Sequence, residues 1–163
     1  MRTFKNVSAK NQALLASTFP MLFEEDWSDS TSLNYRAISI WDHWLGETNE
    51  YHLLVNVNQN EQRSRDNKFR LLHASIIENL KIFNARFSKK WRLKETRNKS
   101  ELYNRLDPSY KKGSSLLLLP EIEVIYSYEG DDTAVIWYQN GSLLTEFDRW
   151  VEEAGLKYIK SKT

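Results

Sequence analysis

The chain of 163 residues contains no cysteine, only five glycines and only three prolines. The absence of cysteine excludes disulfide scaffolds, thiolate zinc sites, iron–sulfur clusters and a cysteine nucleophile. With so few glycines, the sequence also offers no Gly-x-Gly-x-x-Gly loop, no Walker phosphate loop and no Gly-x-Ser-x-Gly nucleophile elbow. We therefore expect no cofactor, and no motif identifies a catalytic residue or a metal ligand.

Long hydrophobic runs are absent as well. Apolar runs such as Leu116–Leu119 are far too short to cross a bilayer. The apolar stretch of residues 13–16 is too short and too broken to be the core of a signal peptide. A chain without cysteine also suits a reducing compartment. We therefore expect a cytoplasmic protein with no membrane partner.

Aromatic side chains, in contrast, are abundant. The chain holds six tryptophans and eight tyrosines, and 40% of its residues are hydrophobic. This composition is that of a globular protein rather than a disordered chain, and the length suits one domain with a core of its own. Tryptophan and tyrosine are also the residues that protein interfaces favour. We expect a single α+β domain over residues 1–163, in which residues 1–34 are peripheral or partly irregular.

Charge is distributed unevenly along the chain, although the net charge is only +1. Residues 1–62 hold 4 Lys and Arg and 8 Asp and Glu, residues 63–112 hold 15 and 5, and residues 113–163 hold 4 and 9. One interpretation is that these segments attract one another within a single fold. The other is a bipolar surface that presents one charged face to a partner.

A helical pattern in the middle of the chain predicts one long central helix over residues 66–93. Large apolar side chains recur there at steps of three or four, which is the spacing of one helix face. They are Phe69, Leu72, Ile76, Leu80, Phe83, Phe87 and Trp91. A helix of this length crosses a small domain from end to end. We interpret it as the scaffold of the protein, not as its functional site.

The remaining periodicity predicts a mostly antiparallel sheet. Residues 36–44 and 51–58 each alternate between apolar and mixed positions, as a half-buried pair of strands does. Residues 116–128 form a strand that Pro120 interrupts, because proline cannot donate to the ladder. Residues 133–139 form the strand that returns from the next turn.

The C-terminal part completes the predicted architecture. In the hairpin, Tyr128 is expected opposite Thr133. A second helix is capped by Ser142 and ends at Gly155, and residues 156–159 add a short final strand. The predicted order is β-β-α-β-β-α-(β), an α+β domain in which the C-terminal helix and the long central helix pack together on one face of the sheet.

Two histidines on the first predicted strand pair suggest one chemical site. If residues 36–44 pair with residues 51–58, His43 lies directly across from His52, with Glu50 nearby. Two such imidazoles are part of a zinc ligand set, so a metal-assisted hydrolase is our third hypothesis. Two half-exposed residues of a sheet explain the same pattern, and we assign no metal ligand.

The basic segment of residues 86–112 supports our second hypothesis, nucleic-acid binding. Its cations alternate with aromatic side chains, and such surfaces bind backbone phosphates and stack on bases. Positive charge at the end of a helix is also favourable through the helix dipole alone. The candidate nucleic-acid contacts are Lys89, Lys90, Arg92, Lys94, Arg97 and Lys99.

Exposed aromatic and acidic side chains support our first hypothesis, a non-enzymatic protein-binding module. Acidic surfaces steer the approach of a basic partner, and tryptophan or tyrosine anchors the contact. We expect an inhibitor of the immunity type, which neutralises a bacterial toxin or nuclease domain that has a basic surface. The candidate partner contacts are Trp41, His43, Asp131, Asp132, Tyr138, Asp148 and Glu152.

Overall fold

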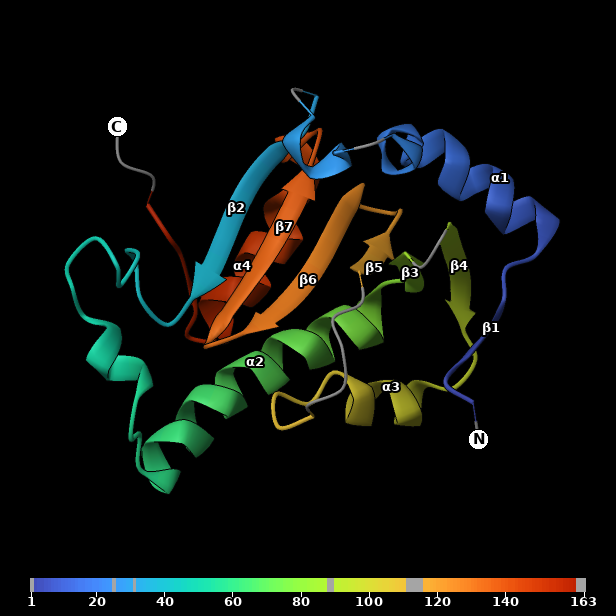
Figure 1. Ribbon diagram of the computed structural model, residues 1–163. Coiled ribbons are helices and arrows are strands. Elements are labelled where there is room, and N and C mark those ends of the chain that lie inside the picture. Colours follow the sequence, from blue (N-terminus) through green and yellow to red (C-terminus); the bar gives the residue numbers. More distant parts are fainter. Residues whose placement is uncertain (1, 25, 31, 88–89, 111–115, 161–163) are drawn as a thin grey trace.

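The computed structural model describes residues 2–24, 26–30, 32–87, 90–110 and 116–160, and within them it shows a mixed α+β fold around one antiparallel sheet (Figure 1). The strands lie in the order β1-β4-β3-β5-β6-β7-β2-β8. The predicted fold class is confirmed. The strands are β1 (Phe4–Asn6), β2 (Asn34–Ser39), β3 (Phe83–Phe87), β4 (Trp91–Thr96), β5 (Leu116–Leu119), β6 (Val124–Gly130), β7 (Thr133–Tyr138) and β8 (Lys157–Tyr158).

Helices cover both faces of this sheet. The α-helices are α1 (Ala9–Thr18), α2 (Gln59–Asn79), α3 (Lys99–Arg105) and α4 (Thr145–Glu153). Short 3-10 helices are η1 (Pro20–Phe23), η2 (Trp27–Asp29), η3 (Tyr51–Leu54) and η4 (Gly141–Leu144). Figure 1 shows α1 beside the end of the sheet that contains β3 and β4, whereas α4 lies against β2 and β7.

The larger core lies between the sheet and the helices α2, α3 and α4. Helix α2 begins after Asn58, whose side chain accepts a hydrogen bond from a backbone N–H of the first turn at 2.9 Å. Its side chains Phe69, Leu72 and Ile76 recur on one face and are fully buried. Burying each of them contributes about 1.5–3 kcal/mol, so this face fixes the helix on the sheet.

The smaller core lies on the opposite face of the sheet, under the N-terminal segment. Leu15 of α1 and the residues Phe19 and Leu22 around η1 pack on Phe83 and Ile125 of the strands. Helix α1 ends at Thr18, just before Phe19 and Pro20, because proline disfavours helical backbone in the residue that precedes it. The N-terminal segment therefore forms the second layer over half of the sheet.

The predicted long helix over residues 66–93 is wrong at both ends. Helix α2 ends at Asn79, and Leu80 already has an extended backbone. Phe83 then belongs to β3 and Trp91 to β4, which pair as a hairpin. Helical spacing and strand alternation both fit these aromatic residues, and packing under α1 selects the strand. Neither glycine nor proline marks the break.

The predicted strand pair of residues 36–44 and 51–58 is also wrong. Strand β2 ends at Ser39, and its partners are β7 and β8. Residues 51–54 form η3 instead of a strand. The left-handed backbone of Asn49 and Asn56, with φ of 57° and 55°, interrupts any extended run on either side. His43 and His52 are therefore not cross-strand neighbours.

The C-terminal half agrees more closely with the sequence pattern. A turn at Pro120 separates β5 from β6, and Gly155, with φ of 77°, follows the end of α4 as predicted. In the β6–β7 hairpin, Tyr128 lies opposite Ala134 instead of Thr133, because the ladder is irregular between Tyr128 and Gly130.

Three further predictions of the C-terminal half can be scored. Residues 156–159 hold the short strand β8, as expected. Asn140, not Ser142, supplies the cap, and the short helix η4 precedes α4. The predicted packing of the C-terminal helix with the long helix is confirmed, because α4 and α2 contribute to the same buried cluster.

One buried polar side chain ties α2 to the sheet. His73 is buried, its Nδ1 lies 2.7 Å from the carbonyl oxygen of Leu106, and its Nε2 lies 2.7 Å from the hydroxyl of Tyr126. A neutral imidazole satisfies both contacts when Nδ1–H donates to the carbonyl and Nε2 accepts from the tyrosine. Burial lowers the pKa of His73 to about 4.

This burial predicts acid-sensitive stability. The unfolded chain takes up a proton on His73 below pH 6.5, whereas the folded protein resists it down to about pH 4. The stability present above pH 6.5 is therefore lost as the pH falls through this window, by about 3 kcal/mol in total. Urea unfolding at several pH values measures this loss. His73→Gln keeps a donor and an acceptor without titrating, so its stability is expected to change less over the same window. An equal loss in both proteins would contradict the assignment.

Candidate functional site: two cavities beside the β6–β7 turn

The turn between β6 and β7, residues 129–132, separates two cavities. Leu54, Glu129, Gly130 and Asp131 line both of them. We name the first the acidic cavity. It has a volume of about 680 Å³, and its lining includes Asp66, Asp107, Tyr110, Tyr126, Tyr128 and Asp132. We name the second the aromatic groove. It has a volume of about 820 Å³, and its lining includes Tyr35, Trp41, His43, Trp44, Tyr51, Val135 and Trp137.

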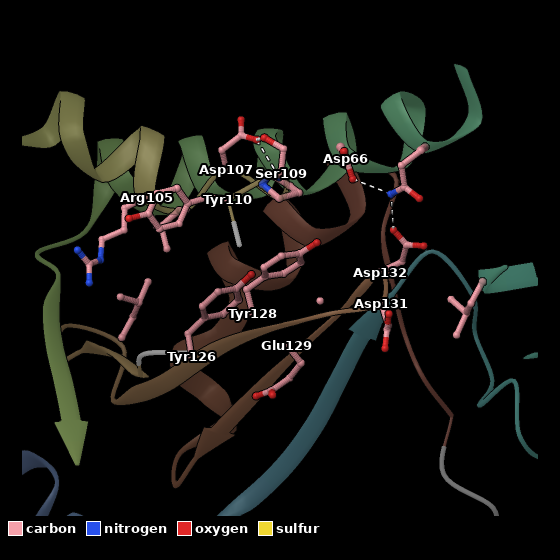
Figure 2. A pocket seen from close by; sticks show the side chains of 16 residues that line it. Asp66, Arg105, Asp107, Ser109, Tyr110, Tyr126, Tyr128, Glu129, Asp131 and Asp132 are labelled. Carbon is pink, nitrogen blue, oxygen red and sulfur yellow. Dashed lines mark hydrogen bonds between the residues drawn. The ribbon is translucent and has the colours of Figure 1, made fainter. Parts of the chain in front are cut away.

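The acidic cavity lies between α2, the segment after α3, and strand β6. Figure 2 shows Tyr126 and Tyr128 at its centre, with Asp131 and Asp132 at one end and Arg105 at the other. The sheet places both tyrosines on the helix-covered face because alternate residues of β6 point the same way. The cavity therefore combines a tyrosine floor with a rim that is mostly acidic.

The pKa of Tyr128 responds to the charged side chains around this cavity. Burial raises the pKa of Tyr128, and the charges of Asp132, Asp66, Asp131 and Asp107 raise it further. Its ring packs on Phe69, with ring centroids 5.0 Å apart. Four carboxylates on α2, on the turn and after α3 thus act on one phenol. The lining of the cavity thus holds more carboxylates than cations, since Arg105 is the one lysine or arginine among its described lining residues.

The carboxylates of the cavity differ in how they are already engaged. Asp107 receives two hydrogen bonds from Arg70, at 2.8 and 3.0 Å, and these hold the pKa of Asp107 well below its usual range. Asp66 accepts a hydrogen bond from Gln62 at 2.8 Å. Within the part of the chain that the structure describes, no ion pair to Lys or Arg neutralises Asp66, Glu129 or Asp131.

Arg65 of α2 anchors the turn between β6 and β7 through a buried contact with Asp132. It is 7% exposed, and its Nη1 donates to Asp132 Oδ2 at 3.1 Å and to the carbonyl oxygen of Leu53 at 3.0 Å. Its Nε donates to Glu61 at 3.0 Å, and its guanidinium lies 5.0 Å from the ring centroid of Trp41. One side chain thus joins α2, η3, the β6–β7 turn and one wall of the aromatic groove.

The turn itself has an unusual backbone. Asp131 and Asp132 both have positive φ, 47° and 55°, as the two central residues of a type I′ hairpin turn require. Aspartate in this region costs about 1 kcal/mol, and the contact of Asp132 with Arg65 offsets it. Burial raises the pKa of Asp132, although Arg65 opposes this shift. The exposed Asp131 is thereby fixed at the edge between the two cavities.

The aromatic groove lies on the face of the sheet opposite α2 and α4. Its floor includes Tyr35 of β2 and Trp137 of β7, which are directly opposite in the ladder and 5.9 Å apart between ring centroids. Its outer wall comes from residues 41–54. Tyr35, Trp44 and Tyr51 are 52%, 38% and 62% exposed. Interfaces favour such exposed aromatic rings around a concave surface.

His43 links the two ends of the loop over residues 42–50, which belongs to the outer wall of the groove. His43 Nδ1 lies 3.0 Å from Asp42 Oδ1, and its Nε2 lies 2.9 Å from Glu50 Oε1. These hydrogen bonds, first that of Asp42 and then that of Glu50, raise the pKa of His43. Lys160 lies 3.3 Å from the other oxygen of Asp42. The loop is therefore bridged by charge-assisted hydrogen bonds when His43 is protonated.

The predicted partner contacts do not form one surface. Trp41 and His43 line the aromatic groove, and Asp131 lies between the two cavities. Tyr138, expected to be exposed, is buried in the core, since its parity in β7 turns it toward the helices. Asp132 is buried by its contact with Arg65.

The two predicted contacts on α4 lie outside the cavities. Asp148 is 3.7 Å from Arg36 and accepts a hydrogen bond from the hydroxyl of Tyr158, and Glu152 is exposed. Among the lining residues that sequence reasoning had not included are Tyr35, Trp44, Tyr51, Asp66, Tyr128 and Glu129. The alternation of β2 and β6 carried a signal for Tyr35 and Tyr128.

The predicted nucleic-acid contacts lie on strand β4 and around it, instead of at a helix end. Lys90, Arg92 and Arg97 are exposed, and Lys89 falls outside the described residues. Lys94 donates to Asn6, and Lys99 lies 3.9 Å from Glu78. These positions follow from the β3–β4 hairpin, which replaces the predicted end of the long helix.

Nothing in the described ranges assembles a metal site or a membrane span. In residues 2–24, 26–30, 32–87, 90–110 and 116–160, no three His, Cys, Asp or Glu side chains are grouped to hold a metal ion. Over the same ranges, no helix is long and apolar enough to cross a bilayer. Both ring nitrogens of His43 already contact carboxylates, and His52 is exposed on η3.

The Arg65–Asp132 pair gives a direct stability prediction. Arg65→Met is expected to destabilise the protein by about 3 kcal/mol, because it leaves the buried carboxylate of Asp132 without its cation. Arg63→Met, on the exposed side of the same helix, is the matched control and is expected to change stability by less than about 0.5 kcal/mol. Arg65→Met/Asp132→Asn, which removes the unpaired charge and keeps a side chain that tolerates the positive φ of position 132, is expected to recover part of the loss. Urea unfolding measures all three, and equal effects of Arg65→Met and Arg63→Met would contradict the role given to this pair.

Comparisons with protein-family models, with curated proteins and with solved structures found no match to this chain. The functional argument therefore rests on the residues themselves. Its strongest elements are the acidic cavity, with three carboxylates outside the ion pairs of the described residues, and the aromatic groove on the other side of the same turn.

Proposed function

We propose that the protein is a non-enzymatic binding protein of the inhibitor or immunity type, which blocks a toxin or nuclease domain through that domain's basic surface. The observation that carries this proposal is the acidic cavity. Asp66, Glu129 and Asp131 surround its tyrosine floor without an ion pair to a described Lys or Arg. A basic side chain of a partner supplies the missing charge.

The geometry favours a protein side chain over a bound metal ion. The carboxylates come from α2 and from the turn, and Gln62 lies between Asp66 and Asp132, at 2.8 and 3.4 Å from their oxygens. A lysine or arginine on a partner surface reaches such separated acceptors with several N–H donors. Metal ions require ligands that converge at 2.0–2.6 Å, roughly, from one point.

Aromatic side chains beside the cavity fit the same function. Interface hot spots are enriched in tryptophan and tyrosine and lie next to groups that exclude water. Here the aromatic groove begins on the other side of the turn that carries Glu129 and Asp131. Charged groups at the rim accelerate the encounter, and aromatic anchors slow dissociation. The pair of cavities supplies both kinds of contact.

The titratable groups support a binding role over catalysis. Both nitrogens of His73 are used inside the core, and both nitrogens of His43 contact carboxylates. A general base needs a ring nitrogen within reach of a substrate proton. In this arrangement these two imidazoles stabilise the fold, and the third histidine, His52, is exposed on η3 and lines neither cavity.

Charge reversal at the cavity tests the proposal. The tagged protein, purified from a native-like lysate, is expected to retain one basic protein at stoichiometric yield. The variant Asp66→Lys/Asp131→Lys is expected not to retain it, because its new positive charges repel a basic partner. Glu24→Lys/Asp29→Lys is the matched control; these carboxylates are exposed on the N-terminal layer and line neither cavity. The purified partner is then titrated with each variant, and its toxic or nuclease activity is measured. Retention by Asp66→Lys/Asp131→Lys, or a partner whose activity is not blocked, would refute the proposal.

Nucleic-acid binding is the second candidate, supported by one specific observation. Arg86 of β3 and Arg92 of β4 lie directly opposite each other, and both are exposed. Like charges in such a pair repel, so a phosphate between them would relieve the repulsion. Lys90, also exposed, precedes β4.

Salt dependence separates this candidate from the first. If the wild type binds a single-stranded oligonucleotide, Arg86→Gln/Lys90→Gln/Arg92→Gln is expected to reduce the slope of log K against log salt by about 2, measured between about 50 and 200 mM salt. The control Asp66→Lys/Asp131→Lys is expected to leave this binding in place. Absence of binding by the wild type at about 50 mM salt would exclude this function.

A further inference from the structure

We propose that the aromatic groove binds an arginine side chain of the basic partner, with the guanidinium stacked on the rings of Trp44 and Tyr51 and directed toward the carboxylates at the turn. This inference rests on the proposed function and names the chemistry that the partner presents to its second cavity. The occupant is an extended protein segment that carries the arginine, since the groove, at about 820 Å³, is open and larger than one side chain.

The walls of the groove are suited to stacking. Trp44 and Tyr51 come from the loop that His43 closes, and Tyr35 and Trp137 form part of the floor. Glycine at position 46 leaves room for the side chain of Tyr51, since a Cβ atom at position 46 would lie 2.4 Å from the Tyr51 hydroxyl. Exposed aromatic rings offer the faces that cations prefer.

The protein already uses the proposed chemistry twice within its own fold. Arg65 places its guanidinium 5.0 Å from the Trp41 ring while it pairs with Asp132. Arg36 lies 5.1 Å from the rings of both Tyr138 and Tyr158 and 3.7 Å from Asp148. Each site combines an arginine, an aromatic face and a carboxylate. The aromatic groove contains the rings and the carboxylates of such a site without the arginine.

The charge of the groove is complementary to an arginine. Glu129 and Asp131 belong to its rim, and its lining, as far as the structure describes it, includes no lysine or arginine. Its one imidazole, His43, is held between Asp42 and Glu50. Burial and then the charge of Glu129 raise the pKa of Tyr35, so the carboxylate acts on the groove floor. An incoming cation therefore meets Glu129 and Asp131, whereas the two cationic groups nearest the groove, His43 and Arg65, are already paired with carboxylates.

Arginine fits this site better than lysine. The guanidinium is planar, weakly hydrated and able to stack while its edge donates to a carboxylate. An ammonium group is compact and strongly hydrated, so it loses more hydration against flat rings. The groove presents ring faces and carboxylate oxygens together, and only a flat cation uses both at once.

The test uses the full chain and short peptides of defined charge. The probe is acetyl-Gly-Arg-Gly-Arg-Gly-amide, titrated into 15N-labelled protein while the tryptophan indole resonances are followed by NMR. The indole signals of Trp41 and Trp44 are expected to shift and saturate. The matched peptide with citrulline, which is flat but neutral, is expected to bind at least tenfold more weakly, and the lysine peptide several-fold more weakly.

Three variants assign the binding to the groove. Trp44→Leu and Tyr51→Leu are each expected to weaken the arginine peptide at least fivefold, and Tyr103→Leu, an exposed tyrosine away from the groove, is the matched control. Gly46→Ala removes no aromatic group but displaces the exposed Tyr51 ring, and it is expected to weaken binding several-fold. Because Gly46→Ala is a small change, a loss of binding in this variant cannot be attributed to the removal of a large side chain from the fold. Equal binding of the citrulline peptide, or no effect of these variants, would overturn the inference.

Other occupants give distinct results. Self-association that Trp44→Leu abolishes would assign the groove to a second copy of the chain, and shifts of the same indoles by an oligosaccharide but not by the peptide would assign it to a carbohydrate. Either result overturns the inference. If the protein captures and blocks a basic partner but the arginine peptide does not bind the groove, only this inference is overturned. If the arginine peptide binds but no partner is blocked, only the proposed function is overturned.

Discussion

The buried contact of Arg65 with Asp132 organises the part of the molecule that carries both cavities. Arg65 reaches from α2 to the β6–β7 turn, to η3 and to the ring of Trp41. The turn has positive φ at both Asp131 and Asp132, a conformation that needs outside support when neither residue is glycine. A buried pair of this kind contributes little net free energy compared with apolar packing. Its value lies in specifying one arrangement of three segments that share no strand pairing.

The sequence was sufficient for the class of the fold because amphipathic periodicity and breaker residues carry that information. The interruption at Pro120 and the helix end at Gly155 were both found from local chemistry. The boundary at Asn79 was not, since Phe83, Phe87 and Trp91 satisfy helical and strand spacing alike. What decides between them is the cover provided by α1, a contact between residues about seventy positions apart. No local window contains that contact.

The sequence predicted the types of residue in the candidate site, but not the full set of residues that line the two cavities. The acidic turn and the abundance of aromatic residues pointed to a partner surface, and Trp41, His43 and Asp131 do line the cavities. Tyr138 was misplaced because a strand face was assigned without knowing which face the helices cover. Asp66 belongs to the cavity because α2 packs across the sheet beside β6, which the sequence pattern does not specify. Cavities join residues from several elements, so their membership depends on the packing of those elements.

The turn between β6 and β7 carries three of the nine Asp and Glu residues in residues 113–163. Strands β6 and β7 are buried on both faces along most of their length, so only their connecting turn can carry charge. That turn then places Glu129 and Asp131 where both cavities open. A partner that neutralises these two carboxylates acts on both cavities at once, through a turn whose geometry Arg65 fixes.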